Sequence, residues 1–208
     1  MTPAGDVWAD APSLSLLLRE ALVRSAAPVI YHGDRTLPAA SLWVGARTTV
    51  RQLRDAGVPP GARLRLRGPD PIGLVVLATA ALSGGFHLEL ARPGDGEDVP
   101  KIAVELHGRE APAGTPRVTV AGLDGLQVPD RPDVPGPGLT AAGAHLSSPE
   151  LGWELLSRLR RLAGPGGADA NGVRPLGVHR CPTPRTLPAL VDDLLLPLVA
   201  AEFLVFSS

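Results

Sequence analysis

The chain has 208 residues and a formal net charge of −1, and this length favours one medium domain or at most two small ones. Its 20 basic residues nearly balance 21 acidic ones, and aromatic residues make up only 3% of the chain. The near-neutral balance argues against a surface for nucleic acid or an anionic membrane, and the scarcity of aromatic rings argues against base stacking. We therefore expect no nucleic-acid partner and no membrane partner.

The sequence also bears on the compartment. Cys181 is the only cysteine, so no intramolecular disulfide can form, and we expect a cytoplasmic location. Residues 1–12 show neither the basic start nor the apolar stretch of a signal peptide. The longest apolar stretches, 72–82 and 194–206, are too short or too interrupted to cross a bilayer.

The first sixty residues predict two helices around a pair of short strands. Residues 13–26 form the first helix, capped by Ser13, because four leucines share one face. Strands follow at 29–31 and 35–37, joined by a turn, and a second helix runs over 38–56 and ends at Gly57. The expected buried residues of the two helices are Leu14, Leu17, Leu18 and Leu22, then Trp43, Ala46, Val50 and Leu53.

Residues 63–90 predict a strand, a buried helix and a second strand. Arginine and leucine alternate over 63–67, which gives a strand with one cationic and one apolar face. Asp70 and Pro71 begin a helix that is apolar on nearly all sides over 72–82 and ends at 83–85. A strand over 86–90 completes a βαβ unit with a parallel strand pair.

The middle of the chain differs in composition. Glycine and proline number 24 and 23 residues, well above ordinary usage, and many of them lie between residues 91 and 138. Two strands are expected there, at 102–106 and 117–121. The rest of this segment is typical of a surface connection between two lobes.

Regular structure resumes after residue 142. We expect a strand at 143–147, a helix from Ser148 to Ala163, a strand at 176–180, a helix over 187–200 and a strand at 203–206. The leucines and valine that should be buried in these two helices are Leu151, Leu155, Leu159 and Leu162, then Leu187, Leu190, Val191, Leu194 and Leu198.

Five segments in collinear order resemble the adenylate-forming enzymes, the AMP-binding superfamily of acyl-CoA synthetases, luciferases and nonribosomal-peptide adenylation domains. Residues 57–64 resemble the family's GV-x-x-GD-x-V segment, and residues 146–151 stand where it has T-H-x-N-L. The other three segments are 28–37, the 81–86 turn and the LLPLVAA run at 195–201. The resemblance implies an α/β fold with mixed, largely parallel sheets flanked by helices, like the N-terminal lobes of these enzymes.

On this reading, residues 1–208 form a single truncated domain. Its first lobe covers 13–90, its connection 91–142 and its incomplete second lobe 143–208. The sequence departs from the family where Ala62 replaces an acidic residue and where Ser148 replaces a frequent histidine.

The family's phosphate loop, rich in Ser, Thr and Gly and usually carrying a lysine, belongs just before the T-H-x-N-L segment. The whole interval here is 138–144, with one hydroxyl and no lysine, which indicates that the loop is deleted. Lys101 is the only lysine and lies far upstream, so the catalytic lysine of the family's C-terminal lid has no counterpart, and the chain ends at Ser208. We expect a pseudoenzyme with no cofactor.

We assign no catalytic, cofactor-binding or metal-binding residue. The glycines at 164–167 follow a helix instead of preceding one, and Pro137 removes an amide from the 136–138 run, so neither fits a phosphate cradle. His179 and Cys181 share a strand face but lack an activating motif. The five histidines, which show no metal-ligand spacing, are His32, His87, His107, His145 and His179.

Several other residues have plain structural interpretations. His87 and His145 should lie near each other if the lobes fold as in the family. Asp192 and Asp193 are expected on the solvated side of the last helix. The arginines at 63, 65 and 67 are expected to face solvent with salt partners instead of binding an anion, and the tryptophans at 43 and 153 to lie in the core or an interface.

Three hypotheses follow. The first is a non-catalytic, adenylate-forming-like domain that binds a protein partner or a small acyl or nucleotide ligand. The second is one subunit of a split acyl-CoA ligase, completed by another polypeptide. The third is a structural oligomerisation module, for which we expect a homodimer through the C-terminal helix and strand, since shortening would leave apolar edges uncovered.

Overall fold

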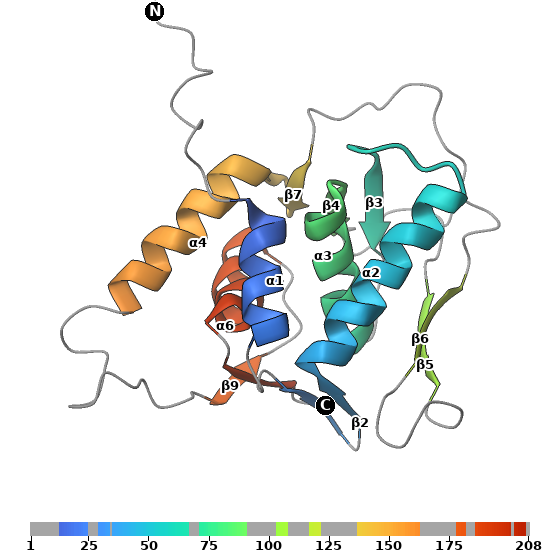
Figure 1. The fold of residues 1–208 in the computed structure, drawn as a ribbon. Coiled ribbons are helices and arrows are strands. Elements are labelled where there is room, and N and C mark those ends of the chain that lie inside the picture. Colours follow the sequence, from blue (N-terminus) through green and yellow to red (C-terminus); the bar gives the residue numbers. More distant parts are fainter. Residues whose placement is uncertain are drawn as a thin grey trace, which may run out of the picture.

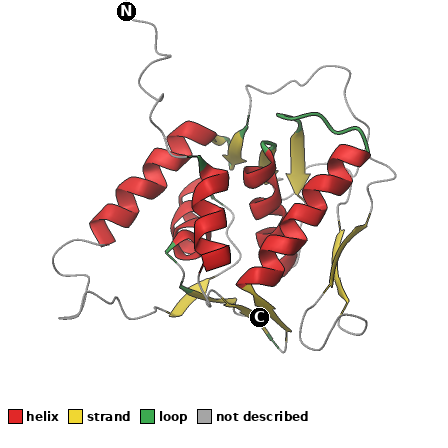
Figure 2. Cartoon of the chain, viewed as in Figure 1, coloured by secondary structure: helices red, strands yellow, loops and turns green. Residues whose placement is uncertain are grey.

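The computed structural model describes residues 13–24, 29–33, 35–66, 71–90, 103–107, 117–121, 137–162, 178–181, 186–200 and 202–206. Helices form a central layer, and two four-stranded sheets lie against it (Figures 1 and 2). The expected class, mixed and largely parallel sheets flanked by helices, is confirmed.

Sheet A combines the two ends of the described chain. It consists of β1 (Val29–His32), β2 (Arg35–Pro38), β9 (Val178–Cys181) and β10 (Phe203–Phe206), in the order β2-β1-β10-β9. Strand β10 pairs in parallel with both β1 and β9, and β2 pairs antiparallel with β1. Both edges of the C-terminal strand are therefore already paired within the chain.

Sheet B consists of β3 (Arg63–Leu66), β4 (His87–Leu90), β7 (Gly138–Ala141) and β8 (Ala144–Ser147), in sequence order. Strands β3, β4 and β7 run parallel, and β8 returns antiparallel along β7. Each large sheet thus takes strands from before and after the proline- and glycine-rich connection, so the sheets do not follow the segments 13–90 and 143–208.

A separate antiparallel pair is formed by β5 (Ala103–His107) and β6 (Arg117–Ala121), which lie beside α3 and α2, respectively (Figure 1). Both strands were predicted within the connection, with β5 one residue further along the chain than expected. The predicted strand 176–180 corresponds to β9, of which 178–181 are described.

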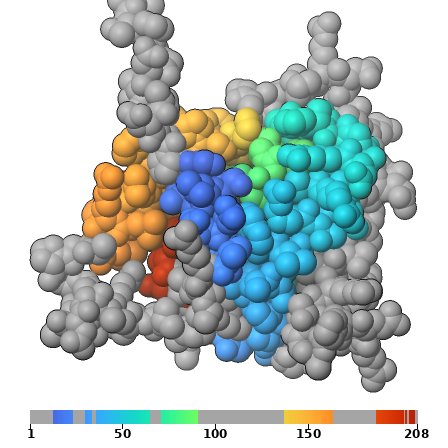
Figure 3. Space-filling model, viewed as in Figure 1, coloured from blue at the N-terminus to red at the C-terminus, as the bar shows by residue number. Residues whose placement is uncertain are grey.

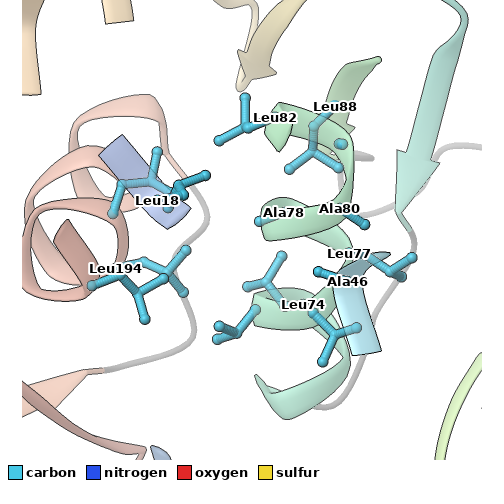
Figure 4. Packing of buried hydrophobic residues seen from close by; sticks show 14 of the residues in the cluster. Leu18, Ala46, Leu74, Leu77, Ala78, Ala80, Leu82, Leu88 and Leu194 are labelled. Carbon is cyan, nitrogen blue, oxygen red and sulfur yellow. The ribbon is translucent and has the colours of Figure 1, made fainter. Parts of the chain in front are cut away.

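Helix α3 (Pro71–Gly84) is the centre of the core, since all of its residues are buried. This confirms the expectation from its all-round apolar sequence. In Figure 4, Leu18 of α1 (Leu14–Arg24) and Leu194 lie on one side of α3, while Ala46 of α2 (Ala39–Asp55) and Leu88 of β4 lie on the other. Helix α3 therefore packs against elements of both sheets.

The amphipathic helices bury the faces that their spacing predicts. The predicted residues of α1 and α2 are buried, except that Leu17 and Trp43 are partly exposed and pack against the core. In α4 (Ser148–Leu162), Leu151 and Leu155 are buried, whereas 159 and 162 are partly exposed. In Figure 3, α1 lies between α4 and α2 on the surface of the molecule.

The last helix departs from the continuous α-helix predicted over 187–200. It consists of α5 (Leu187–Ala189), a π-helical segment η2 (Leu190–Leu195) and α6 (Leu196–Val199). The amide of Leu196 bonds to the carbonyl of Val191, five residues back. Pro197 has no amide and its ring would crowd the carbonyl four residues earlier, so a wider turn before it relieves that clash.

The homodimer expected through the C-terminal helix and strand stays a prediction, and most of the described apolar side chains of these elements lie in the core. Six apolar side chains of the helix are buried within the chain, while Leu196 and Val199 are partly exposed. The six are Leu187, Leu190, Val191, Leu194, Leu195 and Leu198. In β10, Leu204 and Phe206 are buried and Val205 is partly exposed. The large hydrophobic side chains that are exposed among the described residues lie on other elements: Leu16, Val23, Tyr31 and Val44.

Gly57 ends α2 as predicted. The Gly57 amide bonds to the carbonyl of Arg54, and the Val58 amide bonds to that of Leu53, which is the Schellman arrangement. Gly57 has a φ of 82°, and an added Cβ would meet no atom within 4 Å. The residue is therefore needed for its backbone conformation and not for space.

We expect Gly57→Ala to lower the free energy of unfolding by about 1 kcal/mol, since alanine is strained in the left-handed region. Urea unfolding followed by circular dichroism measures this change. Gly57→Asn is the control, because asparagine tolerates the left-handed region better than alanine and should lose less stability. A Gly57→Ala protein as stable as the wild type would contradict the assigned helix end.

Candidate functional site

Sheet B has one apolar and one polar face, because its strands alternate strictly between the two kinds of residue. On the polar face, His87 stands opposite Arg63 and Gly138, and Thr140 stands opposite Glu89 and His145. The buried residues of the other face are Leu64, Leu88, Leu139 and Ala141. The polar face gathers histidine, hydroxyl and charged groups from four strands, and it is our candidate site.

The centre of this face is a cluster of His87, Thr140 and His145, which we call the histidine–threonine cluster. The Thr140 hydroxyl lies 2.8 Å from His87 Nε2 and 3.3 Å from His145 Nδ1. The two imidazole rings are stacked, with centroids 5.2 Å apart and planes 17° from parallel. The expected proximity of the two histidines is confirmed. His87 is only 1% exposed, whereas His145 is exposed.

Gly138 makes the histidine stack sterically feasible. A Cβ added at Gly138 would lie 2.5 Å from the carbonyl oxygen of Leu146 and 3.3 Å from Cε1 of His145. The backbone of β7 therefore comes close to β8, and the ring of His145 lies over the place where a side chain would stand. Only glycine combines this strand pairing with the stacked rings.

The β7–β8 hairpin closes in two residues. Ala142 and Gly143 have φ values of 51° and 85°, so both lie in the left-handed region that a type I′ turn requires. The strands pair from Ala141 and Ala144 at the turn to Gly138 and Ser147 at the far end. The backbone of the whole interval 138–147 is therefore used in a short hairpin.

The far end of the hairpin leads directly into α4, where Ser147 and Glu150 form the glutamate half of a capping box. Glu150 Oε2 accepts hydrogen bonds from the Ser147 hydroxyl at 2.7 Å and from the Ser147 amide at 2.8 Å. These bonds lower the pKa of the Glu150 carboxyl, and the nearby charge of His145 adds to the effect in the same direction. The carboxylate thus ties the end of β8 to the start of α4.

We expect Glu150→Ala to lower the free energy of unfolding by about 0.5–1 kcal/mol at neutral pH, because the capping box is lost. The folded pKa lies below the unfolded one, so this contribution is present above the unfolded pKa and is lost as pH falls through the folded pKa. Glu150→Gln keeps an acceptor without the charge and should lose less. Unfolding at neutral and acidic pH measures both variants, and a deficit of Glu150→Ala that does not shrink in acid would contradict this role.

Several charged residues that the sequence analysis singled out form ion pairs. Arg63 pairs with Glu89 across β3 and β4 at 3.0 Å, which confirms the salt-partner interpretation for that arginine. Arg158 of α4 pairs with Asp192 of η2 and with Glu154 on its own helix. The Asp192 side chain is 45% exposed, as predicted for the solvated side of the last helix, and its ion pair joins α4 to that helix.

The remaining sequence candidates lie elsewhere. His32 is on β1 in sheet A, and Trp153 is partly buried on α4. The 164–167 glycines, Arg67, Lys101 and Gly136 lie outside the described residues, as do the side chains of 65, 107, 179 and 181. Among the described residues, no group of three His, Cys, Asp or Glu side chains could hold a metal ion, and no helix is long and apolar enough to span a membrane.

Sequence reasoning did not predict β7, Thr140 or the capping box. The signals were present, because Gly138 to Ala141 alternates polar or small with apolar residues, and Ala142-Gly143 is a plausible turn. Ser147 and Glu150 have the S-x-x-E spacing of a capping box. A four-residue strand without a β-branched apolar residue is too weak a pattern to stand out alone.

Comparison with known proteins identifies solved structures of similar fold. No protein-family model matches the chain, and no curated protein matches its sequence. The crystal structure of CmiS6 aligns with a TM-score of 0.60 at 16% identity over 95% of this chain and 56% of that one. The crystal structure of IdnL1 aligns with a TM-score of 0.61 at 14% identity, over 92% of this chain and 42% of that one. Apo MatB from Rhodopseudomonas palustris aligns with a TM-score of 0.60 at 14% identity, over 94% of this chain and 45% of that one.

These solved structures have the fold of adenylate-forming, acyl-CoA synthetase-like enzymes, so this chain shares that fold. The chain spans about half the length of each of them. Identities of 14–16% show similarity of fold and do not transfer an activity.

Proposed function

We propose that this chain is a non-catalytic domain of the adenylate-forming fold, one that acts by binding and does not form acyl adenylates. The observation that carries the proposal is the two-residue turn between β7 and β8, at Ala142 and Gly143. The resemblance places the phosphate loop of the adenylate-forming enzymes in this interval.

The chemistry explains why this turn matters. Joining a carboxylate to ATP requires a flexible loop whose free backbone amides surround the β- and γ-phosphates, usually with a lysine. In this chain, the interval consists of two paired strands and a turn that is too short to surround a phosphate group. The one hydroxyl of the interval, Thr140, is already within hydrogen-bonding distance of two histidines. These features support a domain that does not hold ATP in the way adenylation needs.

The exchange of labelled pyrophosphate into ATP, measured with a panel of carboxylates, tests the proposal. We expect no carboxylate-dependent exchange above the protein-free background, while an active adenylate-forming enzyme in the same assay gives a clear signal. Calorimetric titration with ATP is the companion measurement, because it reports binding without turnover. Carboxylate-dependent exchange by the purified chain would overturn the proposal, whatever the calorimetry shows.

The binding role has its own test. A non-catalytic domain of this fold should still recognise a protein partner or a small acyl or nucleotide ligand. Thermal-shift measurements with acyl-CoA thioesters, free carboxylates, AMP and ATP distinguish these ligand classes, since a ligand that binds only the folded state raises the melting temperature. Stabilisation by AMP or an acyl group, without exchange activity, is the result that we expect if the ligand is a small molecule.

A further inference from the structure

The histidine–threonine cluster has an unusual hydrogen-bond stoichiometry. The Thr140 hydroxyl has one hydrogen, so it can donate to only one ring nitrogen, and that nitrogen must be unprotonated. The other ring can donate its own N–H to the threonine oxygen. All these bonds are therefore made when at least one ring is neutral, and a cluster with two imidazolium rings leaves the threonine hydrogen without a ring acceptor.

Charge repulsion opposes a second proton as well. The ring centroids are 5.2 Å apart, and His87 is only 1% exposed, so water reaches the pair only from the side of His145. Two imidazolium cations at this separation would repel each other strongly in such surroundings. The stacked geometry therefore accepts one positive charge much more readily than two.

Charged side chains of the described residues lie around the cluster. They are Arg63 on β3, at the register position beside His87, Glu89 on β4 and Glu150 on α4. Arg63 and Glu89 neutralise each other in their ion pair. Glu150 lies near enough to His145 to feel its charge. Burial disfavours a charge on the ring of His87, whereas the ring of His145 is exposed to water.

We propose that the histidine–threonine cluster is a pH-sensitive contact that holds β4 against the β7–β8 hairpin. The pair takes up its two protons in two separate steps, and the second proton separates the stacked rings and loosens the hairpin. Each histidine binds a proton near pH 6.5 in an unfolded chain. Because the folded pair resists the second proton, the folded state loses stability as the pH falls below that value.

An NMR titration of the full chain tests the coupling between the two rings. The imidazole signals of His87 and His145 are followed between about pH 8 and pH 5, and single His→Gln variants assign them. In His145→Gln, His87 should take up its proton at a pH higher than in the wild type by at least about one unit. His145 is exposed, so this variant is expected to fold. An unchanged midpoint for His87 would overturn the proposal, since burial of His87 alone would then explain its titration.

Urea unfolding over the same pH range tests the effect on stability. The folding equilibrium constant of the wild type should fall by up to about tenfold per pH unit below pH 6.5, which corresponds to one excluded proton. His87→Gln should lack this fall, because the remaining His145 can be protonated in both states. His32→Gln, which removes a histidine from sheet A, is the control and should retain it. Equal pH dependence in the wild type and His87→Gln would contradict the proposal.

Discussion

Gly138→Ala is expected to lower the free energy of unfolding by about 3 kcal/mol. The added Cβ would lie 2.5 Å from the Leu146 carbonyl oxygen and 3.2 Å from Cα of Ser147, and both of these are backbone atoms. A backbone atom cannot rotate away as a flexible side chain can. The hairpin must therefore widen at the point where β7 pairs with β4 on one side and β8 on the other.

Thermal unfolding provides the measurement for Gly138→Ala. For a chain of this length, the expected loss corresponds to a decrease of about 6–12 °C in the melting temperature. Gly85→Ala is the matched control, because Gly85 has a φ of 78° but an added Cβ there would meet no atom within 4 Å. It should cost only the backbone strain, about 1 kcal/mol. If the Gly85 variant loses as much stability as the Gly138 variant, close strand approach is not the cause.

The same Gly138→Ala substitution should also change the geometry of the candidate site. The added Cβ would also lie 3.3 Å from Cε1 of His145, so the ring of His145 must move away from His87. We expect the ring signals of both histidines to shift in Gly138→Ala even at a pH where the protein remains folded. No such shift is expected in Gly57→Ala, since that glycine ends α2 and an added Cβ there would meet no atom within 4 Å.

Leu18→Ala is the second large effect, with an expected loss of about 2–5 kcal/mol in the free energy of unfolding. Leu18 is 1% exposed on α1, the helix that contacts α2, α3 and α6 (Figure 4). Removing three carbons there leaves a cavity between the helices. The surrounding helices are tied to two different sheets, so they cannot easily move together to fill it.

Leu16→Ala is the natural control for Leu18→Ala because it makes the same chemical change two residues away on the same helix. Leu16 is 51% exposed, so the expected change is within about 0.5 kcal/mol. Urea unfolding followed by circular dichroism measures both variants under identical conditions. Comparable losses from the two substitutions would mean that α1 does not pack as described.

Much of the fold could be predicted from local pattern. The helices at α2 and α3 begin and end within a residue or two of their predicted limits, because capping and apolar periodicity are local signals. Strand β7 was missed since its four residues carry little β propensity and are held by pairing with β4 and β8. The π-helical segment was missed because helical spacing does not distinguish a widened turn that precedes Pro197.

The candidate site illustrates the same limit. His87 and His145 were predicted to be neighbours only through the resemblance to a known family, and Thr140 was not singled out. Their approach depends on the order of strands in sheet B and on the missing side chain of Gly138. Neither feature can be read from the spacing of the three residues, which are 53 and five positions apart.

By itself, the sequence determined that the chain forms alternating helices and short strands, with a helix over 72–82 that is apolar on nearly all sides and no lysine in the interval 138–144. These properties follow from composition and periodicity, which act over a few residues. Only the tertiary structure decided that strands from distant parts of the chain share each sheet, that 138–147 closes as a two-residue hairpin, and that two histidines stack across it. Strand pairing joins residues that are far apart in the sequence, so its outcome depends on how all the elements pack together.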